Sequence, residues 1–180
     1  MRIDPKYFNV FIFILAIVAA ALIVFYSVST DRSNQRKFRE FITSSDSLGL
    51  EYWNEAFSND TLSIEELDSR FVLVDFWATW SVYGDERHRH LHRLLEEHPE
   101  ILTVLAASVR NPLEEVREYR EQHGFPFTYV DGTRIFTKYR VPGIPTMILY
   151  GPDGRIRTVF VGFEGEAQID SLNRVISHGS

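Results

Sequence analysis

The stretch that decides the fold is FVLVDFWATWSVYGDE, residues 71–86. Its first seven residues, Phe71–Trp77, form an almost continuous apolar and β-branched run, which is typical of a central strand covered on both faces. Ser81 is predicted to cap a following helix whose first turn holds Asp85 and Glu86, because acids are favourable beside the positive end of a helix dipole. The stretch therefore predicts a buried strand, a short turn and a helix.

Strand and helix patterns alternate along the rest of the chain. A capping box formed by Ser63 and Glu66 predicts one helical turn before the first buried strand. Gly151–Gly154 (GPDG) predicts a hairpin turn between the last two strands. Further strands are predicted at 101–109, 125–130, 146–150 and 156–161, and helices at 111–123, 134–139 and 166–176. This order predicts an α/β fold with a parallel core and an antiparallel edge.

Residues 7–28, YFNVFIFILAIVAAALIVFYSV, form an apolar run with few polar side chains. At about 1.5 Å rise per residue, a helix of this length crosses a hydrocarbon layer roughly 30 Å thick, so we expect a transmembrane anchor. A cleavable signal peptide is the alternative, since Ser27–Ser29 offers a small-residue cleavage site, but the run is longer than a usual secretory core. Basic residues on both sides leave the orientation open: Arg2, Lys6, Arg32, Arg36, Lys37 and Arg39.

The expected organisation is a tail at 1–6, the anchor at 7–28, a juxtamembrane helix and polar linker at 29–47, and one domain at 48–180. Without residues 1–30 the chain carries 17 basic and 24 acidic side chains, a net charge of about −7 that disfavours nucleic acid as a partner. The chain has no cysteine, which excludes disulfides, thiolate metal sites and a cysteine nucleophile.

The segment from Leu62 to Phe163 resembles the thioredoxin fold, and specifically the membrane-anchored TlpA/ResA-like branch of extracytoplasmic thiol-disulfide oxidoreductases. The motifs that carry the resemblance are LSIEELDSRFVLVDFWATW at 62–80 and VPGIPTMILYGPDGRI at 141–156. The resemblance implies a central mixed sheet flanked by helices, preceded by one transmembrane helix. It also implies a single-pass protein whose domain lies outside the cytoplasm, on the periplasmic side of a bacterial inner membrane.

In the family, the tryptophan that matches Trp80 is followed by Cys-x-x-Cys, which places Ser81 and Gly84 at the cysteine positions. Thiol-disulfide exchange needs a reactive thiolate and a second thiol that resolves the mixed disulfide. A serine hydroxyl and a glycine supply neither. We therefore expect no catalytic residues for the family reaction, no cofactor and no enzyme activity of this kind.

Other positions match the family in part. The resemblance implies that Asp75 occupies the position of a buried acid that moves a proton to or from the second cysteine. Because that cysteine is absent, we favour a carboxylate held structurally in the strand, with a functional proton carrier as the alternative. The resemblance also implies that Pro145 is the cis-proline facing the turn and that Trp77 and Trp80 are its flanking aromatic pair. The family motif Glu-Met-Pro is replaced here by residues 87–89, Arg-His-Arg.

A binding groove is expected at Trp80, Val82, Tyr83, Ile144 and Pro145. The backbone of Ile144 can offer strand-like hydrogen bonds to a peptide, as the resemblance implies, and such pairing needs no cysteine. Exposed side chains at 80, 82 and 83 would add apolar contact area, although Tyr83 folded back on the domain surface is the alternative.

His88 and His92 lie four residues apart, on one helix face, with Asp85 or Glu96 one turn away. This spacing can hold a divalent metal, but the intervening arginines oppose cation binding, so a solvated, partly packed helix face is the favoured explanation and no metal is expected. Ser81 as a hydrolytic nucleophile lacks the Gly-x-Ser-x-Gly context.

The sequence thus favours a membrane-anchored thioredoxin-fold protein without dithiol chemistry, acting as a protein- or peptide-binding or assembly module. The alternatives are an accessory component of a thiol-disulfide oxidoreductase pathway and a weak metal-binding protein that uses His88 and His92.

Overall fold

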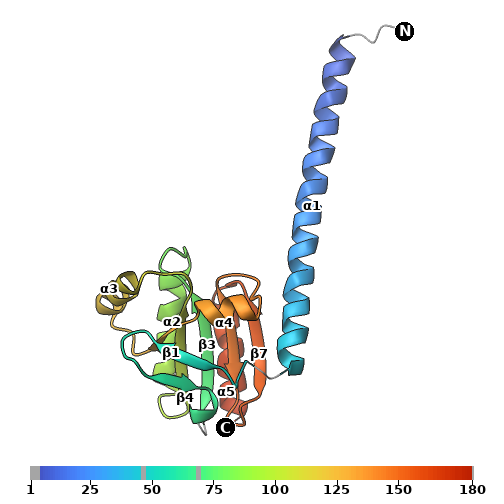
Figure 1. The fold of residues 1–180 in the computed structure, drawn as a ribbon. Helices are drawn as coiled ribbons and strands as arrows, with labels where there is room; N and C mark the ends of the chain where they lie inside the picture. Colours follow the sequence, from blue (N-terminus) through green and yellow to red (C-terminus); the bar gives the residue numbers. More distant parts are fainter. Residues whose placement is uncertain (1–4, 46–47, 68–69, 180) are drawn as a thin grey trace. The chain divides into compact units, whose positions relative to one another are not determined.

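The computed structural model describes residues 5–45, 48–67 and 70–179 (Figure 1). The chain divides into two compact units, residues 1–37 and 38–180, and each is described by itself.

The first unit is built from helix α1, Pro5–Ser45, whose last residues belong to the second unit. Val10–Ser44 is long and apolar enough to cross a membrane, and its apolar side chains from Val10 to Val28 are exposed. A signal sequence would meet the same criterion, so the two interpretations of the N-terminal segment both remain. Residues 43–45, which were expected in the polar linker, form the end of α1. Residues 46–47 of the linker and 1–4 of the expected tail lie outside the described residues.

The second unit contains one seven-stranded mixed sheet in the order β2-β1-β5-β4-β3-β6-β7. Strands β3, β4 and β5 run parallel, and β6 and β7 add the predicted antiparallel edge. The strands are β1 Tyr52–Glu55, β2 Thr61–Ser63, β3 Phe71–Trp77, β4 Leu102–Ser108, β5 Thr128–Asp131, β6 Thr146–Tyr150 and β7 Ile156–Val161. The helices are η1 Glu65–Leu67, α2 Gly84–Glu97, α3 Leu113–His123, α4 Thr133–Lys138 and α5 Glu166–His178. The predicted α/β class and mixed sheet are confirmed.

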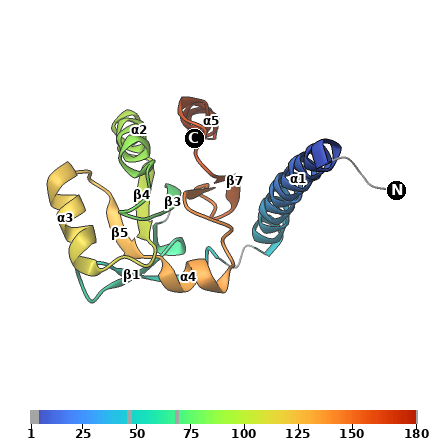
Figure 2. The ribbon, with the colours of Figure 1, turned by 90° about the horizontal axis from the view of Figure 1, so that it is seen from above.

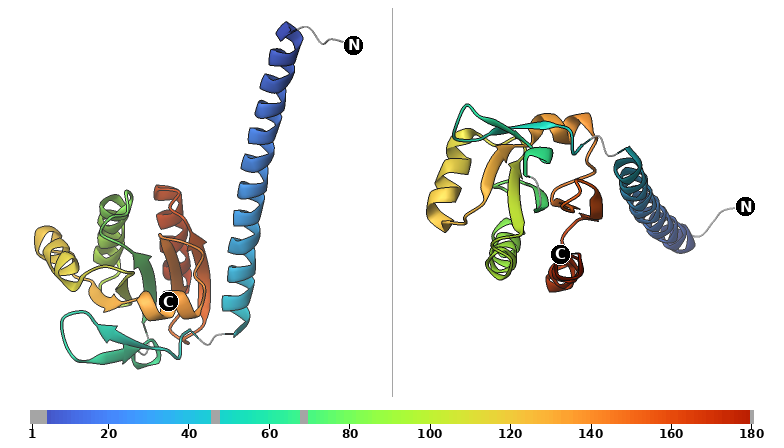
Figure 3. Two further views of the ribbon diagram at one scale, coloured as in Figure 1. Left: turned by 45° about the horizontal axis from the view of Figure 1, so that its top comes forward. Right: turned by 90° about the horizontal axis from the view of Figure 1, so that it is seen from below.

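The alternation of side chains along β3 divides the core into two layers. Val72, Val74 and Phe76 face a cluster that includes α4, while Phe71, Leu73 and Trp77 face α2, α3 and α5. Figures 2 and 3 show α2 and α5 on one side of the sheet and α4 on the other. Asp75 has the parity of the second set, so its carboxylate points into the layer beneath α2.

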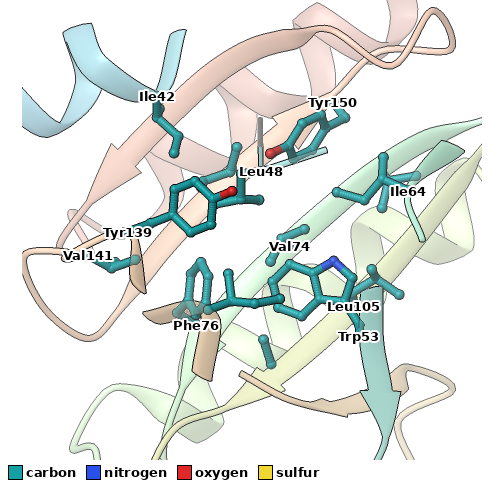
Figure 4. Packing of buried hydrophobic residues seen from close by; sticks show 14 of the residues in the cluster. Ile42, Leu48, Trp53, Ile64, Val74, Phe76, Leu105, Tyr139, Val141 and Tyr150 are labelled. Atoms are coloured by element: carbon teal, nitrogen blue, oxygen red, sulfur yellow. The ribbon is translucent and has the colours of Figure 1, made fainter. Parts of the chain in front are cut away.

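The α4 layer takes in two residues upstream of the expected domain start at Leu48. Phe38 and Ile42, near the end of α1, are buried in this cluster together with Trp53 and Tyr139 (Figure 4). The last turns of α1 are therefore part of the domain core.

The hairpin formed by β1 and β2 was not predicted. Its strands are short, polar residues interrupt them, and Trp53 is their one fully buried apolar side chain, so neither strand shows an alternating pattern. The capping box next to it is confirmed. The Ser63 amide donates to Glu66 Oε2 at 2.7 Å, and the Glu66 amide donates to Ser63 Oγ at 3.3 Å.

Candidate functional site

The loop that carries the former cysteine positions lies between the end of β3 at Trp77 and the start of α2 at Gly84. Two backbone hydrogen bonds shape it, from Ser81 N–H to Ala78 O and from Gly84 N–H to Ser81 O, both 3.0 Å long. The predicted capping role of Ser81 is wrong. The residue flanking the helix is Tyr83, which forms no side-chain cap, and Ser81 lies three residues before the helix starts at Gly84.

Gly84 is buried, but the fold does not require a glycine there. A Cβ atom at this position would meet only the carbonyl oxygen of Ala78, at 3.7 Å, which is an ordinary contact distance. Its backbone lies outside the left-handed region that favours glycine. The structure therefore has space for a Cβ atom at position 84, although this chain has no side chain there.

A second loop meets this one at the same edge of the sheet, because β3 and β6 are antiparallel and Phe76 pairs with Thr146. The Ile144–Pro145 peptide bond is cis, as the resemblance implied. Pro145 is buried, and its carbonyl oxygen accepts a hydrogen bond from Gly162 N–H at 2.8 Å. Ile144 is half-buried, and its backbone forms no hydrogen bond within the part of the chain that the structure describes.

The expected aromatic pair is divided between the core and the surface. Trp77 is fully buried, with its ring centroid 4.7 Å from that of His88 and 4.6 Å from that of Tyr119. Trp80, by contrast, is 66% exposed.

Trp80, Val82 and Tyr83 together form what we call the apolar rim. Val82 is 90% exposed and Tyr83 is 52% exposed. The ring of Tyr83 lies 6.3 Å from the ring of Phe163, so it packs partly on the domain and partly faces solvent. The structure thus places five expected residues, the rim with Ile144 and Pro145, on two loops at one edge of the sheet.

A buried ionic network lies beneath the loop. Asp75, Arg87 and His88 all have side chains that are 0% exposed. Arg87 donates to Asp75 Oδ2 from Nε at 3.1 Å and from Nη2 at 3.0 Å, and His88 Nε2 lies 2.9 Å from the same oxygen. His88 Nδ1 lies 2.9 Å from the Tyr119 hydroxyl. Four side chains from β3, α2 and α3 are therefore joined in one chain of contacts.

The pKa shifts define the protonation of this network. Burial would raise the pKa of Asp75, but the Arg87 guanidinium and the bond from His88 outweigh it and lower that pKa, so the carboxylate is ionised. Burial lowers the pKa of His88 more than Asp75 raises it, so the imidazole is neutral at neutral pH. Burial, followed by the nearby Asp85 carboxylate, raises the pKa of Tyr119 above its ordinary value, so its hydroxyl keeps its proton.

These states fix the direction of each hydrogen bond. A carboxylate can only accept, so we assign the imidazole proton to Nε2, which donates to Asp75, while Nδ1 accepts from the Tyr119 hydroxyl. The positive charge of Arg87 balances the negative charge of Asp75. The network is therefore neutral overall and has no labile proton near neutral pH.

The geometry argues against His88 as a metal ligand of the candidate pair, because both of its ring nitrogens already have partners. In His92, Nε2 lies 3.8 Å from Glu96 Oε1, and the ring packs against that of Phe125. Within residues 5–45, 48–67 and 70–179, no three His, Asp or Glu side chains are grouped so that they could hold a metal ion.

The role of Arg87 as the partner of Asp75 was not predicted. From the sequence, Arg87 stood only as a departure from the family motif. The signal was present in the spacing. Gly84, Arg87, His88, Leu91 and Leu94 recur at helical intervals and are the buried residues of α2. An acid inside a buried strand next to such a helix needs a partner of opposite charge, and this face supplies it.

No family model matches the chain. Its sequence is 24% identical over 168 residues to the thiol-disulfide oxidoreductase ResA of Halalkalibacterium halodurans, which covers 91% of each chain. The chain has a thioredoxin-like fold and is similar in sequence to ResA.

Solved structures agree on the fold. A secreted Mycobacterium tuberculosis disulfide oxidoreductase homologous to DsbE superposes with a TM-score of 0.62 at 17% identity, over 74% of this chain and 99% of that one. A putative thiol:disulfide interchange protein DsbE from Chlorobium tepidum gives 0.63 at 18% identity, over 72% and 92%. This thioredoxin-like domain has no cysteine at 81 or 84, the positions at which the resemblance implies the Cys-x-x-Cys pair.

The buried pair makes a prediction about stability. Replacing Arg87 with Met leaves the Asp75 carboxylate without its cation, and we expect a loss of about 3–5 kcal/mol in the free energy of unfolding at pH 7. Urea unfolding of the full chain in detergent, followed by tryptophan fluorescence, measures this loss. The matched control is Arg89→Met on the exposed face of α2, with an expected change within about 0.5 kcal/mol.

The loss should also depend on pH. In the folded wild-type protein the pKa of Asp75 is lowered. Its contribution to the free energy of unfolding is therefore fully present above the pKa of the unfolded state, about 3.9, and is lost as the pH falls through the pKa of the folded state. In Arg87→Met burial raises that pKa above the unfolded value, so the variant regains stability as the pH falls from about 7 to about 5. Equal losses for the two arginine variants, or a deficit independent of pH, would contradict the assigned pair.

Proposed function

We propose that this chain is a membrane-anchored thioredoxin-fold protein that has no thiol-disulfide activity and binds a protein or peptide at its former active-site edge. The observation that carries this proposal is the combination of an exposed apolar rim with positions 81 and 84 that hold no thiol. The rim retains the contact surface that a binding partner needs, while the chemistry of the family has no sulfur to proceed through.

Backbone pairing supports the same site. Among the described residues, the backbone of Ile144 forms no hydrogen bond. The next residue, Pro145, accepts a hydrogen bond from Gly162, which holds the loop in place. The Ile144 backbone can therefore bond to a partner. An extended peptide can add to such a backbone edge, with its side chains resting on Trp80 and Val82.

The state of Asp75 supports a binding role over a catalytic one. A proton carrier must release and take up a proton near the working pH. Arg87 keeps the carboxylate ionised, and His88 donates to it, so Asp75 acts here as a structural residue of the proposed binding domain.

We further propose that α1 anchors the protein and that the domain lies outside the cytoplasm, following its relatedness to membrane-anchored extracytoplasmic proteins. Protease added to intact spheroplasts of a bacterial host that expresses the chain should then digest the domain, whereas inverted vesicles should protect it. The opposite pattern would place the domain in the cytoplasm, and release of the domain in soluble form would favour the signal-peptide interpretation.

An accessory role in a thiol-disulfide pathway is the second candidate, since the related protein is a thiol-disulfide oxidoreductase. In this role the chain would present a client to a cysteine-bearing enzyme. Co-purification of such an enzyme with the full chain, lost in a Trp80→Ala variant, would favour this role over general binding.

The absence of dithiol chemistry gives a direct prediction. The full chain should reduce insulin disulfides no faster than buffer with dithiothreitol alone, because Ser81 and Gly84 supply no thiolate. The double substitution Ser81→Cys with Gly84→Cys should give measurable turnover, because a side chain at 84 fits the structure. Turnover by the wild-type chain would overturn the proposal, and the single variant Ser81→Cys serves as the control that lacks a resolving thiol.

The binding site gives a second prediction. A photoreactive residue at Val82 in the full chain, in native membranes, should capture a discrete partner, and Trp80→Ala should abolish this capture by removing contact area without disturbing the core. The matched control is the same photoreactive residue at Leu50, which is 61% exposed but lies away from the rim. Identical captures from both positions, or none from Val82 in a folded protein, would exclude this edge as the binding site.

A further inference from the structure

Acidic side chains surround the apolar rim because three helices begin at the same edge of the sheet. Strands β3 and β4 are parallel, and β7 runs in their direction because β6 is antiparallel to both β3 and β7. Helices α2, α3 and α5 follow these strands, so their first turns lie at the edge that carries the rim. Those first turns contain Asp85, Glu86, Glu114, Glu115 and Glu166.

Side-chain contacts connect two of these acidic segments to the rim. Thr79, the residue before Trp80, donates its hydroxyl to Glu115 Oε2 at 2.8 Å. Phe163, whose ring lies 6.3 Å from that of Tyr83, is followed directly by Glu164. In α2, Asp85 and Glu86 come two and three residues after Tyr83. Carboxylates thus approach the rim from three sides.

Some of these carboxylates have partners, and some do not. Asp85 lies 3.7 Å from His123 and Glu86 lies 3.9 Å from His90, while Glu114 pairs with Arg117 at 2.8 Å. Glu164 and Glu166 are exposed and form no ion pair among the described residues.

Cations at this edge are fewer. Arg87 is buried and balanced by Asp75, and Arg134, in the first turn of α4, pairs with Glu51. The exposed arginines near the rim are Arg89, in the second turn of α2, Arg110, in the loop after β4, and Arg140, in the loop before β6. The edge therefore has an excess of negative charge, as does the chain beyond residue 30.

We propose that the apolar rim binds an extended polypeptide segment in which lysine or arginine alternates with apolar residues. This inference rests on the proposed function and names the charge of its partner. The apolar side chains of such a segment cover Trp80 and Val82, and its cations meet the carboxylates around them. Anionic lipid surfaces and acidic peptides are disfavoured at the same edge, because like charges would be brought together there.

Alternation follows from the geometry of an extended chain. Successive side chains of a strand point to opposite sides, so a segment bonded to the backbone of Ile144 turns every second residue toward the domain. The charged residues between them point away from the rim, and their long side chains bend back to the carboxylates of the helix first turns and Glu164 around it. A helical partner would leave the backbone of Ile144 unpaired.

The experiment compares three labelled synthetic peptides of about seven residues, in which leucine alternates with lysine, glutamine or glutamate. The full chain is held in nanodiscs of phosphatidylcholine, and binding is measured by fluorescence anisotropy with empty nanodiscs as the blank. We expect the lysine peptide to bind about tenfold more tightly than the glutamine peptide, and the glutamate peptide to bind more weakly than either. The advantage of lysine should largely disappear between about 0.05 and about 0.5 M salt.

Variants locate the binding. The double variant Glu164→Gln with Glu166→Gln should weaken binding of the lysine peptide about threefold to tenfold and leave the glutamine peptide unchanged. Trp80→Ala should weaken both peptides. The matched control is Glu100→Gln with Glu121→Gln, which removes two exposed carboxylates at the opposite edge of the sheet and should change neither affinity. Thermal unfolding checks that each variant is folded.

The outcomes separate this inference from the proposed function. Equal, Trp80-dependent binding of the lysine and glutamine peptides would overturn the charge inference and leave the proposed function standing. Equal effects of the two glutamate double variants would also overturn it, since binding would then follow overall charge. No binding by any peptide overturns the inference, and failure of capture from Val82 as well removes the proposed function. Self-association of the chain that Trp80→Ala abolishes would make a second copy the occupant and would contradict the proposal.

Discussion

The structure depends on the compensation of one buried charge. Asp75 lies fully buried in the interior strand β3, where a carboxylate without a partner would be strongly unfavourable. Arg87 and His88 resolve this by sending both side chains from consecutive positions of α2 to the same carboxylate oxygen. The pair therefore fixes the position of α2 on the sheet, and with it the loop that carries the apolar rim.

This compensation also determines which chemistry the site can support. A buried acid that exchanges protons needs a neutral form close in free energy to its ionised form, which burial alone provides by raising its pKa. A guanidinium at 3.0 Å reverses that shift and holds the acid in its ionised state. The missing thiols and the buried arginine both oppose the family reaction. The first removes the group that reacts, and the second keeps Asp75 from taking up the proton that it would pass to that group. Such a pair gives specificity of packing rather than large net stability, since the desolvation of both charges offsets their attraction.

Much of this arrangement could be predicted from the sequence, wherever a local pattern determined the outcome. Strands 71–77, 146–150 and 156–161 were predicted at their observed bounds, because long apolar runs and a GPDG turn leave few alternatives. The capping box at Ser63 and Glu66 formed as predicted because both partners are three residues apart. The hairpin of β1 and β2 and the partner of Asp75 could not be predicted in the same way. Pairing of β1 with β5 joins residues more than seventy positions apart, and Arg87 had to be recognised as part of a buried helix face.

The composition of the apolar rim is not explained by the fold. The amides of Ser81 and Gly84 close the turn through backbone hydrogen bonds, and Thr79 is bonded to Asn111 and Glu115. None of these bonds uses the side chains at 80 and 82, so they would also form with polar residues there. Trp80 and Val82 expose most of their surface to water, and neither belongs to either core cluster. Nothing in the packing of the domain requires a tryptophan and a valine at these positions. Contact with the proposed partner would account for their apolar character, and the carboxylates near them would restrict which molecules make that contact.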